Sequence, residues 1–456
     1  MSINKSNIKY FVVLSIQVYN RYYIMRILFI SNDLIAGNLA RRLVDEGHEV
    51  KLYVHERARR GNLDFIVPKT TNWKAELPWV GKNGLIVFDD VGWGKEQSKL
   101  RKQGYTVFGG SVEGDRLETD REYAQIIFSK YGLKTKETKD FEAMYDAIEY
   151  VEKNPKAWVV KQNGHASKSI NYVGFFEDGR DVLSVLKNYL TNPKINKERI
   201  TLQEKINGIE IGVGRYFNGT DWVGPIEFNI EHKKFFPGDI GPTTSEMGTL
   251  AWYSEDENNK LFKEVLNPLA PYLREIDFRG DFEINCIVDE EGAWPLEATP
   301  RFGSPIIHLH DEIHVSPWGE FLYAVARGEK YDLKYKKGYG LVVLIAVPPF
   351  TYTKKEPSSE FYGMNVFFHN LTGEDPEHIH FEEISRDVDN VNQFYISDNR
   401  GYVLYVTGMG ETLPLAIEDT YNRIDKVIIP KMIYRNDVGR RFMDRDEKRL
   451  RDWGYL

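Results

Sequence analysis

From Met25 onward, hydrophobic and polar positions follow a strand–helix–strand pattern. An apolar run at residues 27–30 is followed by apolar residues at helical spacing and then by a second apolar run, VKLYV. This succession is typical of a βαβ unit. Two further apolar runs, LIVFD and YTVFGG, enclose another helical stretch. The pattern therefore predicts a small open α/β domain over residues 25–112. Its first turn, SNDLIAGN, lacks the glycine spacing of a dinucleotide-binding site.

The next segment predicts one helix and, beyond it, a candidate phosphate-binding loop. EGDRLETDREYAQIIFSKYGL carries apolar residues such as Ile126 and Ile127 at helical spacing. After another helix, Lys161 ends an apolar strand, and a loop of small residues from Gly164 carries Lys168. Exposed backbone N–H groups and an ammonium group suit phosphate oxygens. A surface hairpin with solvated lysines explains the same residues equally well.

A β-hairpin is predicted in ITLQEKINGIEIGVGRYFNG, because Asn207-Gly208 separates two apolar runs. Glu204 and Glu210 flank this turn. By itself the hairpin indicates no particular chemistry.

The stretch RGDFEINCIVDEEGAWPLEATPRFGSP predicts two strands joined at residues 289–291. Alternation places Glu283 and Glu297 on one face, directly opposite each other. Two facing carboxylates repel unless a cation lies between them, and Mg²⁺ is a hard ion that prefers oxygen ligands. Arg301 follows closely enough to contact a phosphate group bound by that Mg²⁺ ion. A solvated acidic face is the alternative. The predicted polar face consists of Asp281, Glu283, Asn285, Glu297 and Thr299, and the predicted apolar face of Phe282, Ile284, Cys286, Trp294, Leu296 and Ala298.

Composition narrows the possible partners and the compartment. The net charge of −8 argues against a nucleic-acid-binding surface. The single cysteine, Cys286, cannot form an intramolecular disulfide, which favours a buried thiol in the reducing cytoplasm. The apolar run YFVVLSIQVY near the start is too short to cross a membrane and no small-residue cleavage site follows it. Residues 1–24 are therefore expected to be an extension outside the fold.

Several of these motifs together resemble the phosphoribosylamine–glycine ligase (glycinamide ribonucleotide synthetase) family of ATP-grasp enzymes. LEATPRFGSP resembles the metal-binding strand of that family and its following RFGDP, and EHKKFFPGDIGPTTSEMG resembles its HKR…GDGDTGPNTGGMG. GSVEGDRLETDREYAQIIFSKYGL resembles the entry to the nucleotide domain, and GYVLYVTGMGETLPLAIEDTYNRIDKV with YRNDVGRRF resembles the last domain. The resemblance extends from about Met25 to about Arg441.

The resemblance implies a mixed α/β and α+β architecture, in which a small open α/β domain precedes an ATP-grasp fold and a β-rich domain follows it. The implied ATP-grasp domain covers residues 113–336, with a mobile lid at about 134–210. The β-rich C-terminal domain then covers 337–441, and residues 442–456 form a tail.

The resemblance also implies ATP and Mg²⁺ (or Mn²⁺) as cofactors and a ligase reaction. A carboxylate attacks the γ-phosphate of ATP, and an amine then displaces phosphate from the acyl phosphate to form an amide. The partners are small molecules, with neither nucleic acid nor membrane, and the protein is expected to be a monomer or a weak homodimer. The implied catalytic residues are Lys161 and Arg301. The implied nucleotide-binding residues are Arg121, Lys161, Gly164, Lys168, Glu204, Lys205, Ile206 and Glu210. The implied substrate-binding residues are Gly241, Thr243, Thr244, Met247, Gly248 and Arg301. The implied metal ligands are Glu283, Glu297 and Thr299.

The chain also departs from the family pattern near the substrates. SNDLIAGN and FDDVGWGKEQ replace the family's GNGGREHA and GPE-type turns, and Ser245-Glu246 replaces two glycines. Ser304 and Ile306 stand where RFGDPE has acidic residues. Glu246 either points to solvent, with glycine retained as the substrate, or pairs with a cationic group of a different amino acid or amine.

Two other function classes explain some of the residues. HLHDEIH and the His378-Ile379-His380 alternation resemble zinc-ligand spacing, as in a metal-dependent hydrolase. An ATP-binding protein without activity is the third class. A zinc hydrolase leaves the glycine-rich segment GDIGPTTSEMG and the paired glutamates unexplained, and production of ADP distinguishes a ligase from an inactive ATP-binding protein.

Overall fold

The computed structural model of the protein describes residues 24–162, 171–193, 195–351 and 360–456. Two predictions lie outside these described residues. They are the N-terminal extension, apart from Ile24, and the candidate phosphate-binding residues Gly164 and Lys168. Within the described part, no helix has the length and apolar character that a bilayer crossing requires.

The N-terminal region is a parallel sheet with strand order β2-β1-β3-β4, which confirms the predicted βαβ opening. Ile27, Phe29 and Leu85 are fully buried in it, because both faces of the sheet are covered. Its strands are β1 (Arg26–Ser31), β2 (Glu49–Val54), β3 (Leu85–Phe88) and β4 (Thr106–Phe108), and its helices are α1 (Gly37–Asp45), α2 (Leu77–Val80) and α3 (Gly94–Lys102).

The helix predicted after this sheet is in fact two helices, α4 (Val112–Thr119) and α5 (Arg121–Lys130). Asp120 between them is extended, and its carboxylate accepts a hydrogen bond from the Tyr123 backbone N–H at 3.0 Å. An aspartate that caps a new helix in this way ends the preceding one. Ile126 was expected on the apolar face but is 57% exposed.

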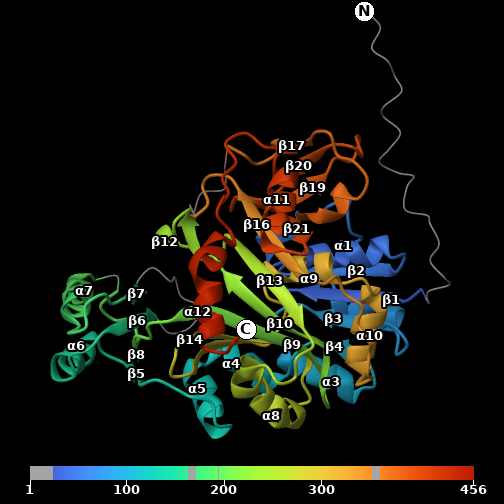
Figure 1. Cartoon of the computed structure of the whole chain (residues 1–456). Helices are drawn as coiled ribbons and strands as arrows, with labels where there is room; N and C mark the ends of the chain where they lie inside the picture. The colour runs from blue at the N-terminus through green and yellow to red at the C-terminus, as the bar shows by residue number, and fades with distance from the viewer. Residues whose placement is uncertain (1–23, 163–170, 194, 352–359) are drawn as a thin grey trace, which may run out of the picture.

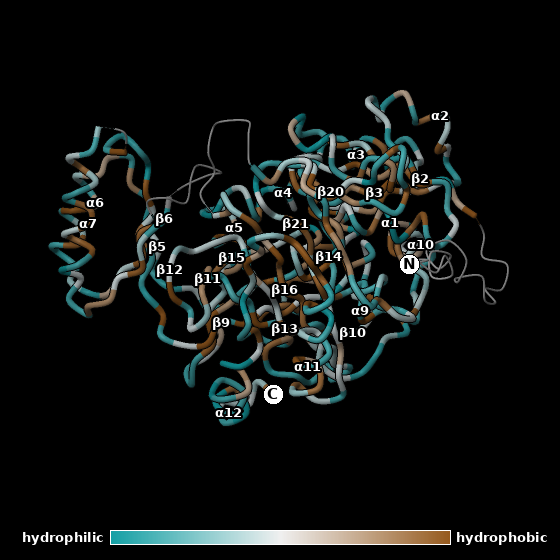
Figure 2. Tube along the Cα trace, turned by 90° about the horizontal axis from the view of Figure 1, so that it is seen from above, coloured by the Kyte–Doolittle hydropathy of each residue, from teal (hydrophilic) through white to brown (hydrophobic). Residues whose placement is uncertain are grey.

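A small separate lobe follows, built on a second sheet with the order β5-β8-β6-β7. Its core includes Trp158, Val160 and Leu202, and it lies beside the main body in both views (Figures 1 and 2). Its strands are β5 (Thr138–Phe141), β6 (Trp158–Gln162), β7 (Tyr172–Val173) and β8 (Ile200–Glu204), and its helices are α6 (Met144–Lys153) and α7 (Arg180–Thr191).

The hairpin predicted around Asn207-Gly208 is wrong. The strand before this turn, β8, pairs within the small lobe, whereas the strand after it, β9 (Ile209–Asn218), pairs with two strands of the main body. Residues 205–208 therefore connect the two lobes. Gly208 is required here because a Cβ would lie 2.2 Å from the Val288 carbonyl oxygen.

The main body contains an eight-stranded sheet with the order β15-β14-β9-β10-β13-β16-β21-β18. Its strands, besides β9, are β10 (Trp222–Glu231), β13 (Gly248–Ser254), β14 (Arg279–Val288), β15 (Ala293–Thr299), β16 (Tyr339–Ala346), β18 (Ile379–Phe381) and β21 (Tyr402–Gly410). A short hairpin of β11 (Lys234–Phe236) and β12 (Ile240–Thr243) extends from this body. The sheet therefore joins segments from both sides of the domain boundary predicted at residue 337.

The remaining elements complete the main body and the C-terminal region. A four-stranded sheet with the order β19-β20-β17-β22 packs near the N-terminal sheet (Figure 1). Its strands are β17 (Asn365–Phe368), β19 (Ile384–Arg386), β20 (Phe394–Ile396) and β22 (Val427–Ile428), and the remaining helices are α8 (Ala270–Glu275), α9 (Ile306–Ile313), α10 (Trp318–Arg327), α11 (Leu413–Ile424) and α12 (Glu447–Asp452).

One buried ion cluster connects the N-terminal and C-terminal regions. Arg59 is 2% exposed and contacts four carboxylates. Its guanidinium donates to Glu383 at 2.9 Å and to Glu382, and it lies 3.2 Å from Asp33 and 3.5 Å from Asp398. The cluster fixes the loop after β2 against the segment between β18 and β21.

Candidate functional site

One face of the eight-stranded sheet carries a set of buried carboxylates and amides. Glu283 on β14 lies next to β9, where Gly212 leaves room for it, because a Cβ there would meet Glu283 Oε1 at 2.6 Å and Asn229 Oδ1 at 2.5 Å. Asn229 donates to Glu227 at 2.7 Å, and Asn285 donates to Glu231 at 2.9 Å. Burial, with Glu227 and Glu231 nearby, raises the pKa of Glu283 well above its usual range. The face is therefore short of positive charge.

The predicted pairing of Glu283 with Glu297 is wrong, since Glu283 pairs with Thr299 and Glu297 pairs with Asn285. The connecting loop holds four residues, because Val288 already pairs with Ala293, and a bulge lies between Asn285 and Cys286. The longer loop and the bulge each shift the register by one residue. The two shifts together return Glu297 and Thr299 to the predicted polar face.

Between the loop and the bulge, only the longer loop shifts the register, by one residue. The prediction therefore assigned Trp294, which lies in this part, to the wrong face of the sheet. It pairs with Ile287 on the polar side of the sheet and donates from Nε1 to Asp289 at 3.1 Å. The ammonium group of Lys136 lies 4.0 Å from its ring centroid. Pro295 beside the bulge has no N–H for the ladder, which is tolerated because β15 is an edge strand.

Lys233 lies at the edge of the acidic face and was missed by the sequence analysis. Its ammonium group is 2.6 Å from Glu210, 2.7 Å from Glu231 and 3.8 Å from Glu297. Burial acts to lower the pKa of Lys233, but these three carboxylates raise it well above its ordinary value. The basic pair in EHKKFF, directly after a strand that ends in glutamate, was the available signal.

Lys161, on β6 of the small lobe, faces the same region. Burial lowers the pKa of Lys161 to about 8, with Arg121 acting in the same direction and Glu297 and Glu210 opposing it. These electrostatic partners show that two predicted phosphate contacts, Lys161 and Arg121, lie near the predicted metal ligand Glu297 and near Glu210. The structure thus brings together the two cations and two of the carboxylates.

The residues predicted to hold adenine lie at the junction of the two lobes. The carboxylate of Glu204 is 2.8 Å from Lys156 and 3.7 Å from Lys136. The Lys205 backbone N–H donates to the Ala157 carbonyl at 3.0 Å. Ile206 follows on the connection between β8 and β9. Their role in nucleotide binding stays a prediction.

Arg301, predicted as a catalytic and substrate-binding residue, is held by the N-terminal side of the site. Its guanidinium donates two hydrogen bonds to Glu118, at 3.0 and 3.1 Å, and lies 3.8 Å from Asp90. Burial acts to lower the pKa of Arg301, but Glu118 and Asp90 raise it. Arg301 therefore connects the acidic face of the large sheet with the turn after β3.

The segment GDIGPTTSEMG was predicted as a substrate loop and forms much of the β11–β12 hairpin. Gly241 has a φ of +84°, a conformation that favours glycine, and Thr243 pairs with Lys234. Thr244 donates from its hydroxyl to the Lys233 carbonyl at 2.9 Å. The tip is anchored because Asp239 accepts from Arg435 at 2.7 Å and from Arg441 at 2.6 Å.

Glu246 does not point to solvent, so the first of the two interpretations of this residue is wrong. Its side chain is buried, and its carboxylate accepts a hydrogen bond from the Thr249 hydroxyl. Burial, followed by the neighbouring Glu231, raises the pKa of Glu246 well above its usual range. The raised pKa disfavours the charged form of the Glu246 carboxylate, which lessens repulsion of a carboxylate substrate nearby.

Met247 and Gly248, predicted as substrate contacts, are buried in the sheet. A Cβ on Gly248 would lie 2.6 Å from the Val342 carbonyl and 2.9 Å from Val438. We therefore expect Gly248→Ala to lower the free energy of unfolding by about 1–3 kcal/mol through overpacking. Urea unfolding measures this, with Gly61→Ala as the control, since a Cβ there has only one atom within 4 Å. A variant of normal stability that binds substrate poorly would contradict this packing role.

The histidines that resembled a zinc site have separate partners. His310 bonds Glu227 at 2.7 Å and Tyr216 at 2.8 Å, whereas His380 bonds Asn38 and Thr407. His378 bonds Glu312. In the described part of the chain, no group of three or more histidine, cysteine, aspartate or glutamate side chains is arranged to hold a metal ion. The histidine pattern therefore does not support the zinc hydrolase alternative.

The turn FDDVGWGKEQ follows β3 at the carboxyl edge of the N-terminal sheet. Asp89 is fully buried, and one of its oxygens accepts from the Ala36 N–H at 3.1 Å. Burial, together with Asp90, raises the pKa of Asp89 to about 7. This acidic turn lies where the family pattern has a GPE-type sequence.

The raised pKa of Asp89 predicts a stability that depends on pH. Between about pH 4 and 7 the folded protein holds a proton that the unfolded chain has lost, so stability falls as pH rises, by about 1.4 kcal/mol per pH unit. Asp89→Asn should therefore become more stable relative to the wild type over this range, and the difference should level off above pH 7. Chemical unfolding at several pH values tests this against the exposed control Asp444→Asn. Parallel pH profiles for the wild type and Asp89→Asn would contradict it.

Comparison with known proteins agrees with this arrangement. Residues 119–306 match the family model of the phosphoribosylglycinamide synthetase ATP-grasp (A) domain. The chain is 24% identical over 377 residues to the phosphoribosylamine–glycine ligase of Fusobacterium nucleatum, covering 80% of this chain and 84% of that protein. It is 25% identical over 433 residues to the same-named enzyme of Listeria monocytogenes, covering 90% and 99%.

Solved structures show the same fold. A phosphoribosylamine–glycine ligase of Thermotoga maritima superposes with a TM-score of 0.69 at 20% identity, over 91% of this chain and all of that one. A biotin carboxylase of Campylobacter jejuni superposes with a TM-score of 0.60 at 12% identity, over 95% and 98%. The chain is therefore similar in sequence to phosphoribosylamine–glycine ligases and has their fold, and its residues 119–306 match the ATP-grasp (A) domain of phosphoribosylglycinamide synthetase.

Proposed function

We propose that the protein is an ATP-dependent carboxylate–amine ligase that joins glycine to phosphoribosylamine in purine synthesis. The observation that carries this proposal is the electrostatic interaction of the buried Lys161 of the small lobe with Arg121, Glu297 and Glu210 of the main body. Cations from both lobes close to carboxylates of the main body are what a nucleoside triphosphate and its metal ion require. The similar protein of Listeria monocytogenes, which covers 90% of this chain, is named a phosphoribosylamine–glycine ligase.

The acidic face fits a divalent ion of the Mg²⁺ or Mn²⁺ type. Its donors are oxygens, and Asn229 Oδ1 and Asn285 Oδ1 are buried without a hydrogen-bond partner among the described residues. Glu283, Glu297 and Thr299 would hold the ion, with nucleotide phosphates completing its ligands, as hard ions with few protein ligands require. When bound, the ion would neutralise charge on the β- and γ-phosphates.

The protein residues supply positioning and charge in both steps. In the first step the substrate carboxylate attacks the γ-phosphorus, the bond to the β-phosphate oxygen breaks, and ADP leaves. In the second step the amine nitrogen attacks the acyl carbon, inorganic phosphate leaves, and the nitrogen loses a proton. In this proposal Lys161 and Arg121 hold the transferring phosphate. Lys233 keeps Glu210, Glu231 and Glu297 in place beside it.

The identity of the amine acceptor depends on the N-terminal turns. In this chain Asp89 and Asp90 stand where the family has a GPE-type turn. An ATP-grasp ligase with another amino acid or amine is therefore the second candidate. We further propose that the protein works in the cytoplasm as a monomer or weak homodimer. The domain boundaries at residues 112 and 441 are part of the same proposal, whereas the eight-stranded sheet runs across the boundary predicted at residue 336.

The test is ADP release with MgATP, glycine and phosphoribosylamine, compared with reactions that omit one component or replace glycine by another amino acid. The expected result is ADP release that requires both named substrates. Glu246→Gly, which restores a family glycine, should retain this specificity because the buried Glu246 carboxylate is already bonded to Thr249. The wild type could release no ADP with glycine and phosphoribosylamine and yet release ADP with another amino acid or amine. That result would contradict the proposed substrates and leave only the assignment as an ATP-dependent ligase.

A further inference from the structure

Glu118 on helix α4 holds Arg301, and the reaction steps described above give Glu118 no role. Its carboxylate accepts from Arg301 Nε at 3.1 Å and from Arg301 Nη2 at 3.0 Å. A carboxylate that accepts two parallel N–H groups fixes the plane of a guanidinium as well as its position. The side chains of Arg301 and Glu118 are 20% and 23% exposed, so the pair is largely shielded from solvent.

The remaining donors of Arg301 suit a substrate oxyanion. A guanidinium has five N–H groups, and Glu118 accepts from two of them. The Phe302 carbonyl accepts a third, from Nη1, at 2.8 Å. In the described part of the chain, one N–H on Nη1 and one on Nη2 have no hydrogen-bond acceptor. Neighbouring guanidinium N–H groups of this kind bind carboxylate or phosphate oxygens.

Arg301 also lies close to the acidic face of the large sheet. Its guanidinium interacts electrostatically with Glu283, a predicted metal ligand, as well as with Glu118 and Asp90. A Cβ on Gly303, close to Arg301 in the chain, would lie 3.7 Å from Glu283 Oε2. The guanidinium therefore lies between the N-terminal turn and the predicted metal site, where the proposed reaction brings the substrate carboxylate and the γ-phosphate together.

Helix α4 gives Glu118 a fixed base. Asp115, one turn before Glu118, accepts from the Gly94 N–H at 2.8 Å and so holds the turn after β3. Gly94 packs directly on the start of α4, because a Cβ there would lie 2.5 Å from the Ser111 carbonyl oxygen. The helix therefore fixes Arg301 and the N-terminal turn relative to each other.

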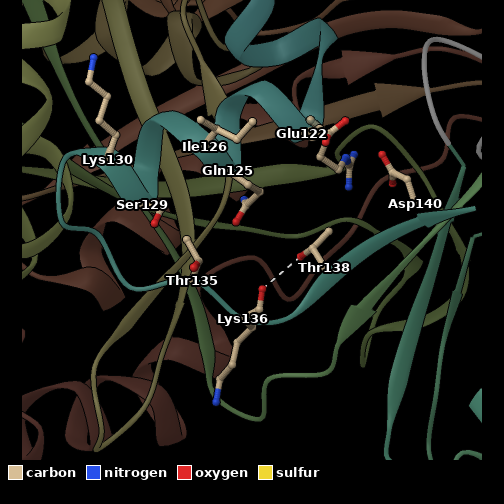
Figure 3. A pocket seen from close by; sticks show the side chains of 10 residues that line it. Glu122, Gln125, Ile126, Ser129, Lys130, Thr135, Lys136, Thr138 and Asp140 are labelled. Carbon is tan, nitrogen blue, oxygen red and sulfur yellow. Dashed lines mark hydrogen bonds between the residues drawn. The ribbon is translucent and has the colours of Figure 1, made fainter. Parts of the chain in front are cut away.

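The next helix, α5, continues this support toward the nucleotide side. It begins shortly after Glu118, at Arg121, which is a predicted phosphate contact. Along its length α5 lines a cavity of about 520 Å³ against the start of the small lobe (Figure 3), and Arg121 is among the lining residues. One short segment thus carries both a predicted phosphate contact and the carboxylate that holds Arg301.

We propose that Glu118 is a positioning residue of the ligase reaction, which holds Arg301 side-on so that its two remaining N–H groups face the substrate oxyanion. The role of Glu118 rests on the proposed function, because the ligand of Arg301 is then the reacting carboxylate or phosphate. Glu118 stays bound to Arg301 and touches no substrate atom.

The first test is steady-state ADP release by Glu118→Gln, measured with a substrate pair that the wild type turns over. The substitution keeps the size of the side chain but removes its charge and one of its two acceptor oxygens. We expect kcat to fall about 10–100-fold, because the guanidinium loses its fixed plane. The KM for ATP should not rise, since Arg301 keeps its charge. Glu118→Asp, which restores a carboxylate, should recover part of the loss and provides a second variant if Glu118→Gln does not fold.

A double-mutant cycle separates positioning from an independent role. The double variant Glu118→Gln/Arg301→Lys should be no slower than Arg301→Lys alone, because Glu118 acts only through Arg301. The matched control is Glu113→Gln, at an exposed glutamate of the same helix, which should behave as the wild type does. Thermal unfolding of each variant checks that the fold is intact.

A spectroscopic readout needs no reaction. In ¹⁵N-labelled full-length protein, the Nε–H signal of Arg301 is assigned by its absence in Arg301→Lys. This proton should exchange slowly with water in the wild type and in Glu113→Gln, and faster in Glu118→Gln, because its acceptor is weakened.

Three results would overturn the proposal. The first is a wild-type kcat in Glu118→Gln. The second is a double variant in which the two losses multiply, which would give Glu118 a role of its own. The third is a loss in Glu118→Gln that consists only of a raised KM for ATP, which would make Glu118 part of nucleotide binding. A wild type that is silent with glycine and phosphoribosylamine but active with another pair contradicts only the proposed substrates, since the cycle is then measured with that pair.

Discussion

Replacing Glu297 by glutamine should lower kcat/KM for ATP by about 10²–10³-fold while leaving the fold intact. Glu297 is 49% exposed, so little packing depends on it. Its carboxylate lies 3.8 Å from Lys233 and is the exposed member of the acidic face that meets Lys161. Losing this charge removes stabilisation of the reacting phosphate, which is a loss in the transition state.

The control for Glu297→Gln is Glu290→Gln, an exposed glutamate in the loop of the same hairpin. Steady-state ADP release and thermal unfolding should be measured on both variants. Both should unfold at the wild-type temperature, and only Glu297→Gln should lose activity. Near-normal turnover in Glu297→Gln would remove Glu297 from the proposed metal and phosphate site.

Arg59→Leu should have the largest effect on stability, about 3–5 kcal/mol, because it leaves buried carboxylates without their cation. Arg59 contacts Glu382, Glu383 and Asp398 from the C-terminal region. Burial raises the pKa of Glu382 to about 8 and that of Glu383 to about 7, even with Arg59 beside them. These groups are therefore costly to leave charged.

Urea unfolding measures this effect, and Arg57→Leu is the matched control because Arg57 is exposed two residues earlier. Adding Glu382→Gln to Arg59→Leu should recover part of the loss, since it removes one of the unpaired charges. A loss no larger than that of Arg57→Leu would show that the cluster does not hold the two regions together.

The sequence predicted the parallel N-terminal sheet well because β1, β3 and β4 are buried apolar runs and β2 alternates buried and half-buried residues. The family resemblance also assigned Lys161, Arg121, Glu210 and Glu297 to one site, and Lys161 interacts electrostatically with the other three residues. It did not predict Lys233, because a lysine after a strand is usually solvated. Only the tertiary contacts with three carboxylates identify it.

The errors arose where alternation along the chain does not determine which strand is the partner or how long the turn is. Alternation could not show that Asn207-Gly208 connects two lobes, since both flanking strands are apolar. It also could not show the four-residue loop or the bulge next to Pro295, and either one moves Glu283 away from Glu297. Glu246 was misjudged because burial of a carboxylate depends on its surroundings, here Thr249 and Glu231.

The eight-stranded sheet limits how this protein can be divided or recombined. Strand β13 lies inside the ATP-grasp segment, but its outer neighbour β16 comes from beyond residue 337, and β21 and β18 follow it. A fragment that ends at 336 would leave the edge of β13 without its partner, and exposed edges of this kind associate with other chains. The ATP-grasp segment and the C-terminal strands thus share one sheet, so a working chimera would have to exchange them together.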